Sequence, residues 1–172
     1  MTVPPEVLAL LASWRGVPAF VRDARLDVVA SNPLARAVSA AFSPGVNLVR
    51  FTFLNQWTED ATREWSEVSA QVVAILRGAI DARPGDDALR DLVGELSVGS
   101  EQFSSLWAAP GGRVSTVGTI TIEHPIVGAL PLTYQALAIP ATPDLSLVIW
   151  TAATAEAQAA LDLLIEVTER DG

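Results

Sequence analysis

The sequence predicts an α+β fold, a five-stranded antiparallel sheet with helices packed on one face. Three observations lead to this prediction. Apolar residues recur every three or four positions through most of residues 58–107, which is typical of amphipathic helices. After Pro110-Gly111-Gly112 the period changes to two, which indicates strands. The links between the last strands are too short for a crossover helix, so these strands are expected to run antiparallel.

The N-terminal part of the chain predicts a helix, a hairpin and a second helix. Pro4-Pro5-Glu6 begins a short amphipathic helix that Gly16 ends. Residues 18–23 and 26–31 are short runs rich in β-branched residues, which favours a two-stranded hairpin. Asn32-Pro33 then supplies an N-cap side chain and a proline at the first helical position, so a helix is expected to follow.

The middle of the chain predicts a block of helices. Residues 47–57 fit either a strand or a short helical segment, and we favour the helix. Thr58 can cap a long helix, which Arg83-Pro84-Gly85 ends. Asp86 and Ser100 can cap two further helices, because apolar residues at helical spacing follow each of them.

Three strands and a last helix complete the predicted order. The strands are residues 113–123, 128–139 and 145–152, and the helix is residues 155–168. This order resembles that of a PAS domain, in which two strands, helices and three antiparallel strands follow one another. In VVASNPLARAVSAAF a second strand runs into Asn and a helix of small residues, a pattern that is common in PAS sequences. Another open α+β sandwich would produce a similar pattern.

Composition excludes several kinds of protein. The 172 residues fit one domain, residues 1–172, and include no Cys, so there is no disulfide and no cysteine-ligated metal. The net charge is −9, which argues against nucleic-acid binding by bulk charge. The N-terminus lacks the features of a signal peptide, and no stretch is apolar enough to span a membrane. We therefore expect a cytoplasmic protein.

Six motifs in order resemble the C-terminal ligand-binding domain of MmyB-like transcription regulators. They are PAFVRDARLDVVASNPLARAV, NLVRFTFLN, AILRGAI, LVGELSVGSEQFSSLWA, HPIVGALPLTYQALAIP and DLSLVIWTA, and the resemblance covers roughly residues 5–167. It implies a PAS-like domain with an apolar pocket that holds a fatty acid. It also implies a homodimer that contacts DNA only through an XRE-type helix-turn-helix, a segment that we expect to be missing from this chain.

The sequence departs from the family pattern near the expected pocket. Residues 109–114 stand where the family has His-Asp-Val, and Ile120-Thr121 stand where a basic residue often occurs. Thr133 and Gln135 replace acidic residues beside the family's tyrosine. A different ligand on the same fold is consistent with these changes.

His124, the single histidine of the chain, is expected to have a structural role. It precedes Pro125 in a predicted turn, and the adjacent Glu123 points to the opposite face of the strand. Histidine catalysis needs an orienting carboxylate and usually a nucleophile, and a metal site needs more ligands. We therefore expect no enzyme activity, no metal and no cofactor.

An apolar ligand would be bound mainly by large side chains of the helices and strands. The candidate ligand-binding residues are Phe20, Phe53, Trp57, Trp65, Val72, Leu76, Phe103, Trp107, Tyr134 and Trp150. The alternative is that each belongs to the ordinary core. The hydroxyl of Tyr134 needs a partner if it is buried, and this partner is either a ligand carboxylate or a backbone carbonyl.

Arg50 and Arg77 are candidate anchors for a carboxylate, because they occupy positions where the resembling family usually has Arg. The alternative is an ion pair with an acidic neighbour such as Glu67 or Asp81, or exposure to solvent.

The leading hypothesis is a sensory domain of a bacterial transcription regulator that binds an apolar small molecule, such as a fatty acid or acyl compound. The ligand would act through its different affinities for two packings of the helices. One alternative is a PAS-like dimerisation or interaction module without a ligand. A small hydrolase or isomerase is disfavoured, because the chain has neither a catalytic motif nor metal-ligand spacing.

Overall fold

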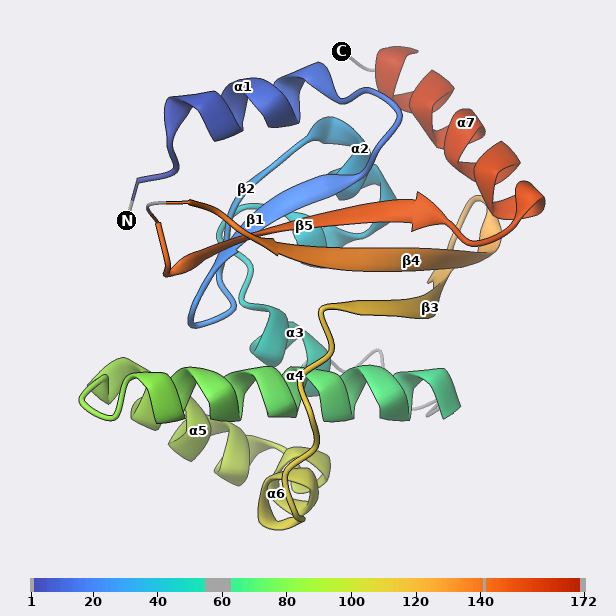
Figure 1. Cartoon of the computed structure of the whole chain (residues 1–172). Coiled ribbons are helices and arrows are strands. Elements are labelled where there is room, and N and C mark those ends of the chain that lie inside the picture. The colour runs from blue at the N-terminus through green and yellow to red at the C-terminus, as the bar shows by residue number, and fades with distance from the viewer. Residues whose placement is uncertain (1, 55–62, 141, 171–172) are drawn as a thin grey trace. The chain divides into compact units, whose positions relative to one another are not determined.

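The computed structural model describes residues 2–54, 63–140 and 142–170, and for residues 63–67 it describes the backbone alone. Figure 1 traces the chain from a first helix and two strands through a block of helices to three strands and a last helix, the order predicted from the sequence. The residues fall into two compact units. The sheet unit comprises Met1–Asp23, Asp27–Val46 and Thr116–Gly172, and the helical unit comprises Ala24–Leu26 and Asn47–Ser115. A single domain over residues 1–172 stays a prediction.

The sheet confirms the predicted fold class. Its strands are β1 (Ala19–Asp23), β2 (Val28–Ser31), β3 (Val117–His124), β4 (Gly128–Ala138) and β5 (Leu145–Ala152). They lie in the order β2-β1-β5-β4-β3, and each neighbouring pair is antiparallel. The first hairpin therefore joins the C-terminal three strands through β1 and β5.

The register of the central strands separates two faces of the sheet. Phe20 lies opposite Val148 in the β1–β5 pair, and Tyr134 lies opposite Trp150 in the β4–β5 pair. Paired residues project to the same side of a sheet, and successive residues of one strand project to opposite sides, so residues two positions apart share a side. These four side chains therefore share one face. We call it the aromatic face, and Arg22 also lies on it, two positions after Phe20.

The opposite face of the sheet packs against α1 (Pro5–Ser13). Leu11 of α1 is buried together with Ala19 and Val21 of β1, which alternate with Phe20. The buried residues of this cluster are Val3, Leu11, Ala19, Val21, Ala30, Ile139, Leu145 and Leu147. This face is thus a conventional aliphatic core.

Asn32 joins four segments of the sheet unit. Its Oδ1 accepts hydrogen bonds from the Ala19 and Ala35 N–H groups, at 3.1 and 3.0 Å. Its Nδ2 donates to the carbonyl oxygens of Trp14 and Val17, at 3.0 and 2.7 Å. The side chain is buried and satisfied, and it caps α2 (Pro33–Val38) as the sequence predicts.

Two further helical elements belong to the sheet unit. The short 3₁₀ helix η1 (Ala40–Phe42) follows α2, and α7 (Ala155–Arg170) follows β5. α7 buries Ala157, Leu161 and Leu164 along one side. In the part of the chain that the structure describes, no helix has the length and apolar character needed to span a membrane.

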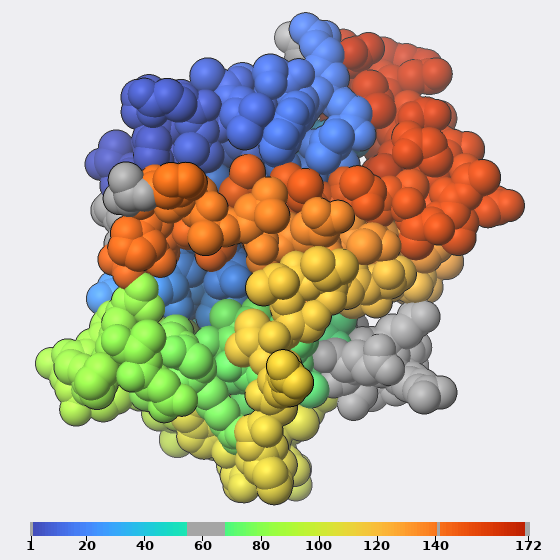
Figure 2. Space-filling view, viewed as in Figure 1, coloured from blue at the N-terminus to red at the C-terminus, as the bar shows by residue number. Residues whose placement is uncertain are grey.

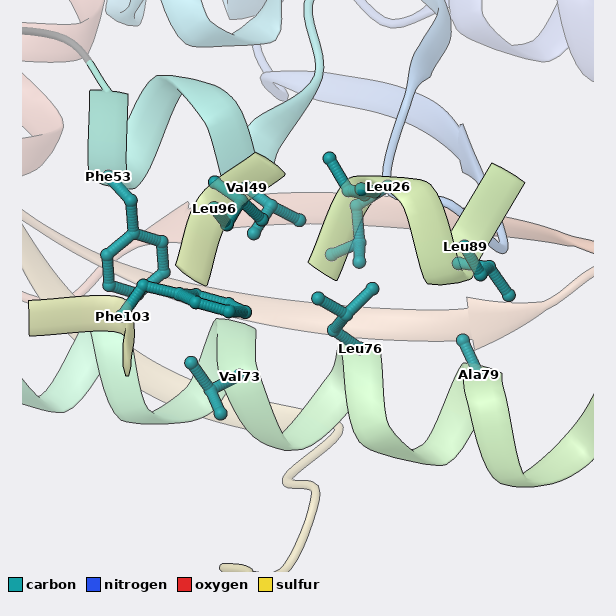
Figure 3. Packing of buried hydrophobic residues seen from close by; sticks show 10 residues of the cluster. Leu26, Val49, Phe53, Val73, Leu76, Ala79, Leu89, Leu96 and Phe103 are labelled. Carbon is teal, nitrogen blue, oxygen red and sulfur yellow. The ribbon is translucent and has the colours of Figure 1, made fainter. Parts of the chain in front are cut away.

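The helical unit has its own hydrophobic core. Its helices are α3 (Leu48–Leu54), α4 (Arg63–Ala82), α5 (Asp87–Gly99) and α6 (Glu101–Ala108). Figure 3 shows their apolar side chains pointing toward one another around Leu76 and Phe103, neither of which is exposed. The predicted helix at residues 47–57 is confirmed over α3. Asp86 and Ser100 cap α5 and α6 as predicted, and the predicted cap Thr58 lies outside the described residues.

Residues Ala24–Leu26 belong to the helical unit although they connect β1 to β2. Leu26, at a φ of 63°, is buried in the helical core. Asn47 donates from Nδ2 to the Arg25 carbonyl oxygen at 2.9 Å, and the Leu48 N–H donates to the Leu26 carbonyl oxygen. These bonds attach the connection to the start of α3.

The predicted start of the third strand at residue 113 is wrong, because β3 begins at Val117. The side chain of Gln71 on α4 binds the backbone of Ser115, donating to its carbonyl oxygen at 2.6 Å and accepting from its N–H at 3.4 Å. Ser115 is thereby held in the helical unit. A local period of two does not show this contact, which joins segments distant in sequence.

Replacing Asn32 tests how much its four side-chain hydrogen bonds contribute to the stability of the sheet unit. We expect Asn32→Ala to lower the free energy of unfolding by about 3 kcal/mol, because it leaves buried N–H and carbonyl groups without partners. Asn32→Asp keeps the accepting oxygen and should be less destabilising. Urea unfolding followed by circular dichroism measures the stability of both variants. An unchanged urea midpoint for Asn32→Ala would contradict the structural role given to the Asn32 side chain.

Candidate ligand-binding site

Four aromatic rings form a continuous cluster on the aromatic face. The ring of Phe42 stacks on Phe20 at a centroid distance of 4.7 Å and on Trp150 at 5.2 Å. Trp150 in turn contacts Tyr134 at 5.5 Å. Three strands and η1 thus each contribute one ring. Phe20, Phe42 and Trp150 are buried and Tyr134 is partly exposed, so the cluster is an apolar wall that a ligand would have to enter beside rather than an open surface.

Phe42 is a member of this cluster that the sequence analysis did not select. It lies at the end of η1, whose start is capped by the Ser39 hydroxyl accepting from the Ala41 N–H at 3.2 Å. The sequence did indicate that Phe42 is an apolar position at the end of the helical segment that Asn32 begins. Sequence spacing alone does not show that this segment returns to Phe20 and Trp150.

Gly118 allows the ring of Tyr134 to lie across β3. Gly118 and Tyr134 are directly paired, and a Cβ atom on Gly118 would lie 2.8 Å from the Tyr134 hydroxyl oxygen. Because that distance is too short for any side chain, glycine is required while the ring holds this position. The β3–β4 pair therefore fixes where the tyrosine hydroxyl lies.

Two polar groups on the aromatic face stand out. Trp150 is 5% exposed, and its Nε1 is buried without a hydrogen-bond acceptor among the described residues. Arg22, also missed by the sequence analysis, is of intermediate exposure. Its guanidinium has neither a hydrogen bond nor an ion pair with any residue that the structure describes. Burial lowers the pKa of Arg22 below its ordinary value, while electrostatic interactions with Asp23 and Tyr134 oppose this shift.

The predicted ligand-binding residues divide between the two units. Phe20, Tyr134 and Trp150 come together in the sheet unit. The residues placed in the helical unit are Phe53, Val72, Leu76, Phe103 and Trp107. Trp57 lies outside the described residues, and Trp65 lies on α4 within the stretch where the backbone alone is described.

In the helical unit the predicted residues pack as members of its core. Phe103 meets Phe53 edge to face at 5.2 Å and stacks on Trp107 at 5.6 Å. Leu76 is fully buried, and Val72 packs against the same cluster. These contacts are those expected of the ordinary-core alternative.

The two predicted arginine anchors have protein partners. Arg50 forms an ion pair with Glu95, with Nη2 and Oε2 2.7 Å apart and a second contact through Nε at 3.0 Å. The hydrogen bonds from Arg50 hold the pKa of Glu95 below its ordinary value, although burial opposes them. This pairing corresponds to the ion-pair alternative, with Glu95 as the acidic partner.

Arg77 closes the C-terminal end of α6. Its Nη2 donates to the carbonyl oxygens of Leu106, Trp107 and Ala109, and its guanidinium lies 5.1 Å from the Trp107 ring centroid. Carbonyl groups at a helix end need such donors. The contacts of Arg77 are therefore structural within the helical unit.

His124 organises the β3–β4 turn, as predicted. Its Nε2 lies 2.8 Å from the Ala37 carbonyl oxygen, and its Nδ1 accepts from the N–H groups of Ile126 and Val127 at 3.1 and 3.4 Å. The ring therefore carries its proton on Nε2. Within the described residues, His, Asp and Glu side chains form no cluster able to hold a metal ion.

A separate pocket of about 230 Å³ lies in the sheet unit between the segments that include α1, α2 and α7. Figure 2 shows the blue N-terminal segment and the red C-terminal helix meeting on this side. Trp14, Leu34 and Ile165 supply apolar lining, and Arg15 pairs with Glu169 at 3.5 Å on the surface. Because its charged residues pair with each other, this pocket offers a ligand less specific chemistry than the aromatic face.

Comparison with known proteins identifies a family. Residues 3–164 match the family model described as MmyB-like transcription regulator ligand binding domain. The match covers most of the chain and confirms the resemblance carried by the sequence motifs. A search of curated proteins gives no match.

Gly118→Ala tests the position of the Tyr134 ring. The added methyl group must displace the ring, and we expect a loss of about 1–3 kcal/mol in the free energy of unfolding. Gly94→Ala is the matched control, since nothing lies within 4 Å of a Cβ there and the helix should gain about 0.5–1 kcal/mol. Equal stability of the two variants in urea would show that the ring does not occupy this position.

Proposed function

The chain belongs to the family of MmyB-like transcription regulator ligand-binding domains, and we propose that its ligand is an apolar small molecule such as a fatty acid. The observation that supports this most directly is the four-ring cluster of the aromatic face, in which the Nε1 of Trp150 is a buried donor and beside which Arg22 is partly buried. Membership establishes a ligand-binding domain of transcription regulators. The fatty acid and its place on the aromatic face are the proposal.

Apolar contact supplies enough free energy for this binding. Each methylene removed from water contributes about 0.8 kcal/mol, so about ten methylenes give about 8 kcal/mol before the cost of ordering the chain. Phe20, Phe42 and Trp150 stack as one connected apolar cluster, which an alkyl chain would contact if it entered beside them. Rings also bind an alkyl chain with little loss of rotamer entropy, because each has two side-chain torsions.

Regulation would follow from different affinities for two conformations of the domain. We propose a cytoplasmic homodimer that takes part in transcription regulation and carries out no catalysis. The hydrogen bonds of His124 support a non-enzymatic role, because Nδ1 and Nε2 are both engaged with backbone groups. Neither nitrogen is then available to move a proton.

A ligand-free dimerisation or interaction module is the second candidate. Val117 and Leu137 are 53% and 44% exposed. They flank Gln135, since Val117 is its cross-strand partner and Leu137 is two positions further along β4. Both therefore lie on the face opposite Tyr134. Apolar side chains at this position suit a protein partner better than solvent.

Ligand binding is tested with the purified chain. We expect native mass spectrometry to detect a co-purified lipid, and dodecanoate to quench or shift tryptophan fluorescence saturably. Phe42→Leu should weaken dodecanoate binding several-fold, because a ring of the cluster is lost, while Leu137→Ala on the opposite face should not. If no lipid co-purifies and dodecanoate does not titrate, the proposal fails. A monomer–dimer equilibrium that Leu137→Ala shifts would then favour the interaction module.

A further inference from the structure

We infer that the ligand carries an anionic head group, and that Arg22 pairs with it while Trp150 donates a hydrogen bond from Nε1. This inference rests on the proposed function, since it assigns the polar end of the same ligand. It replaces Arg50 and Arg77 as anchors with a residue of the sheet unit. Arg22 is thus a specificity-determining residue of the aromatic face.

The register places both donors beside the rings. Arg22 lies opposite Ser146 on β5, two positions along each strand from the Phe20–Val148 pair. Trp150 follows Val148 by two positions on the same face. Phe20 therefore lies between the two residues along the sheet. The Arg22 guanidinium interacts electrostatically with Tyr134, whose ring lies 5.5 Å from that of Trp150, so one polar group beside Tyr134 can meet both donors.

The Trp150 N–H and the Arg22 guanidinium both lie in surroundings where a protein normally supplies a hydrogen-bond acceptor or a carboxylate. A buried indole N–H without an acceptor is unfavourable, and a partly buried guanidinium without a carboxylate is more so. The Trp150 Nε1 and the Arg22 guanidinium are both in this position with respect to the described residues. An oxyanion satisfies both, because it accepts several hydrogen bonds and carries the opposite charge.

Three other arginines, Arg25, Arg50 and Arg77, differ from Arg22 because their donors have partners within the protein. Arg50 is paired with Glu95, Arg25 with Asp86 at 3.0 Å, and Arg77 with three carbonyl groups. Their donors are already used within the protein. Arg22 combines partial burial, a position beside the ring cluster and a guanidinium without a hydrogen-bond or ion-pair partner in the described part of the chain, which suits it to bind an anion.

The experiment compares ligands that share a tail and differ in the head group. Dodecanoate, dodecyl phosphate and dodecanol are titrated against the whole chain and its variants by tryptophan fluorescence. We expect the wild type to bind at least one anion tenfold or more tightly than the alcohol. A preference for dodecanoate indicates a carboxylate ligand, and a preference for dodecyl phosphate indicates a phosphate ligand.

Arg22→Met should remove this preference and leave dodecanol binding unchanged, and Arg22→Lys should retain part of it. Trp150→Phe should weaken binding of the anion several-fold more than binding of the alcohol. Arg50→Met is the matched control and should retain the full preference. Without ligand, Arg22→Met should unfold at the same or a higher temperature than the wild type, since it removes an unpaired cation.

The outcomes separate this inference from the proposed function. Equal binding of the anions and the alcohol by the wild type, or a preference that persists in Arg22→Met, overturns the inference while apolar binding stands. The absence of binding by all three compounds overturns both. Loss of the preference in Arg50→Met alone would assign the anchor to the helical unit instead.

Discussion

The pairing of β1 with β5 is the constraint on which the rest of the sheet unit depends. It joins strands from opposite ends of the chain and fixes Phe20 opposite Val148 and Arg22 opposite Ser146. Because side chains alternate along a strand, a slip of one residue would turn Phe20 and Arg22 to the face of α1 and bring Val21 to the aromatic face. Asn32 opposes such a slip, since its Oδ1 binds the N–H of Ala19 in β1 and that of Ala35 in α2. The buried side-chain amide of Asn32 thus fixes the position of β1 relative to α2, the helix that precedes Phe42.

The two faces of the sheet then serve different purposes. Toward α1, aliphatic side chains pack with hydrophobic partners and contribute stability. On the aromatic face, the rings lie beside a buried indole nitrogen and a partly buried guanidinium. A sequence selected for stability alone would replace these polar groups with apolar ones of similar shape. Local conflicts with folding rules occur mostly where a protein has a function, so this face is the one on which to place the ligand.

Local signals predicted much of the fold, and contacts distant in sequence account for what was missed. The caps Asn32, Asp86 and Ser100 could be predicted because each binds N–H groups within three residues of itself. Arg22 was not selected, because its importance follows from a register that sequence spacing does not reveal. Arg50 was selected from the family resemblance, but its ion-pair partner Glu95 is 45 residues away and belongs to another helix. The aromatic residues were selected because they are large, and size does not separate Phe103, in a packed core, from Trp150, whose Nε1 has no acceptor among the described residues.

The polar groups also distinguish the two candidate functions. In a module that only binds another protein through the opposite face, Arg22 and the Nε1 of Trp150 would contribute nothing to binding. Their desolvation would still lower the stability of the fold. A ligand-binding domain recovers that free energy when an anion arrives, and it recovers it for anions alone. The same arrangement gives discrimination, because a site with donors that lack partners rejects an uncharged analogue more strongly than an apolar surface does. The unfavourable burial of two donors in the sheet unit is therefore an argument for a ligand, and for one with an acidic end.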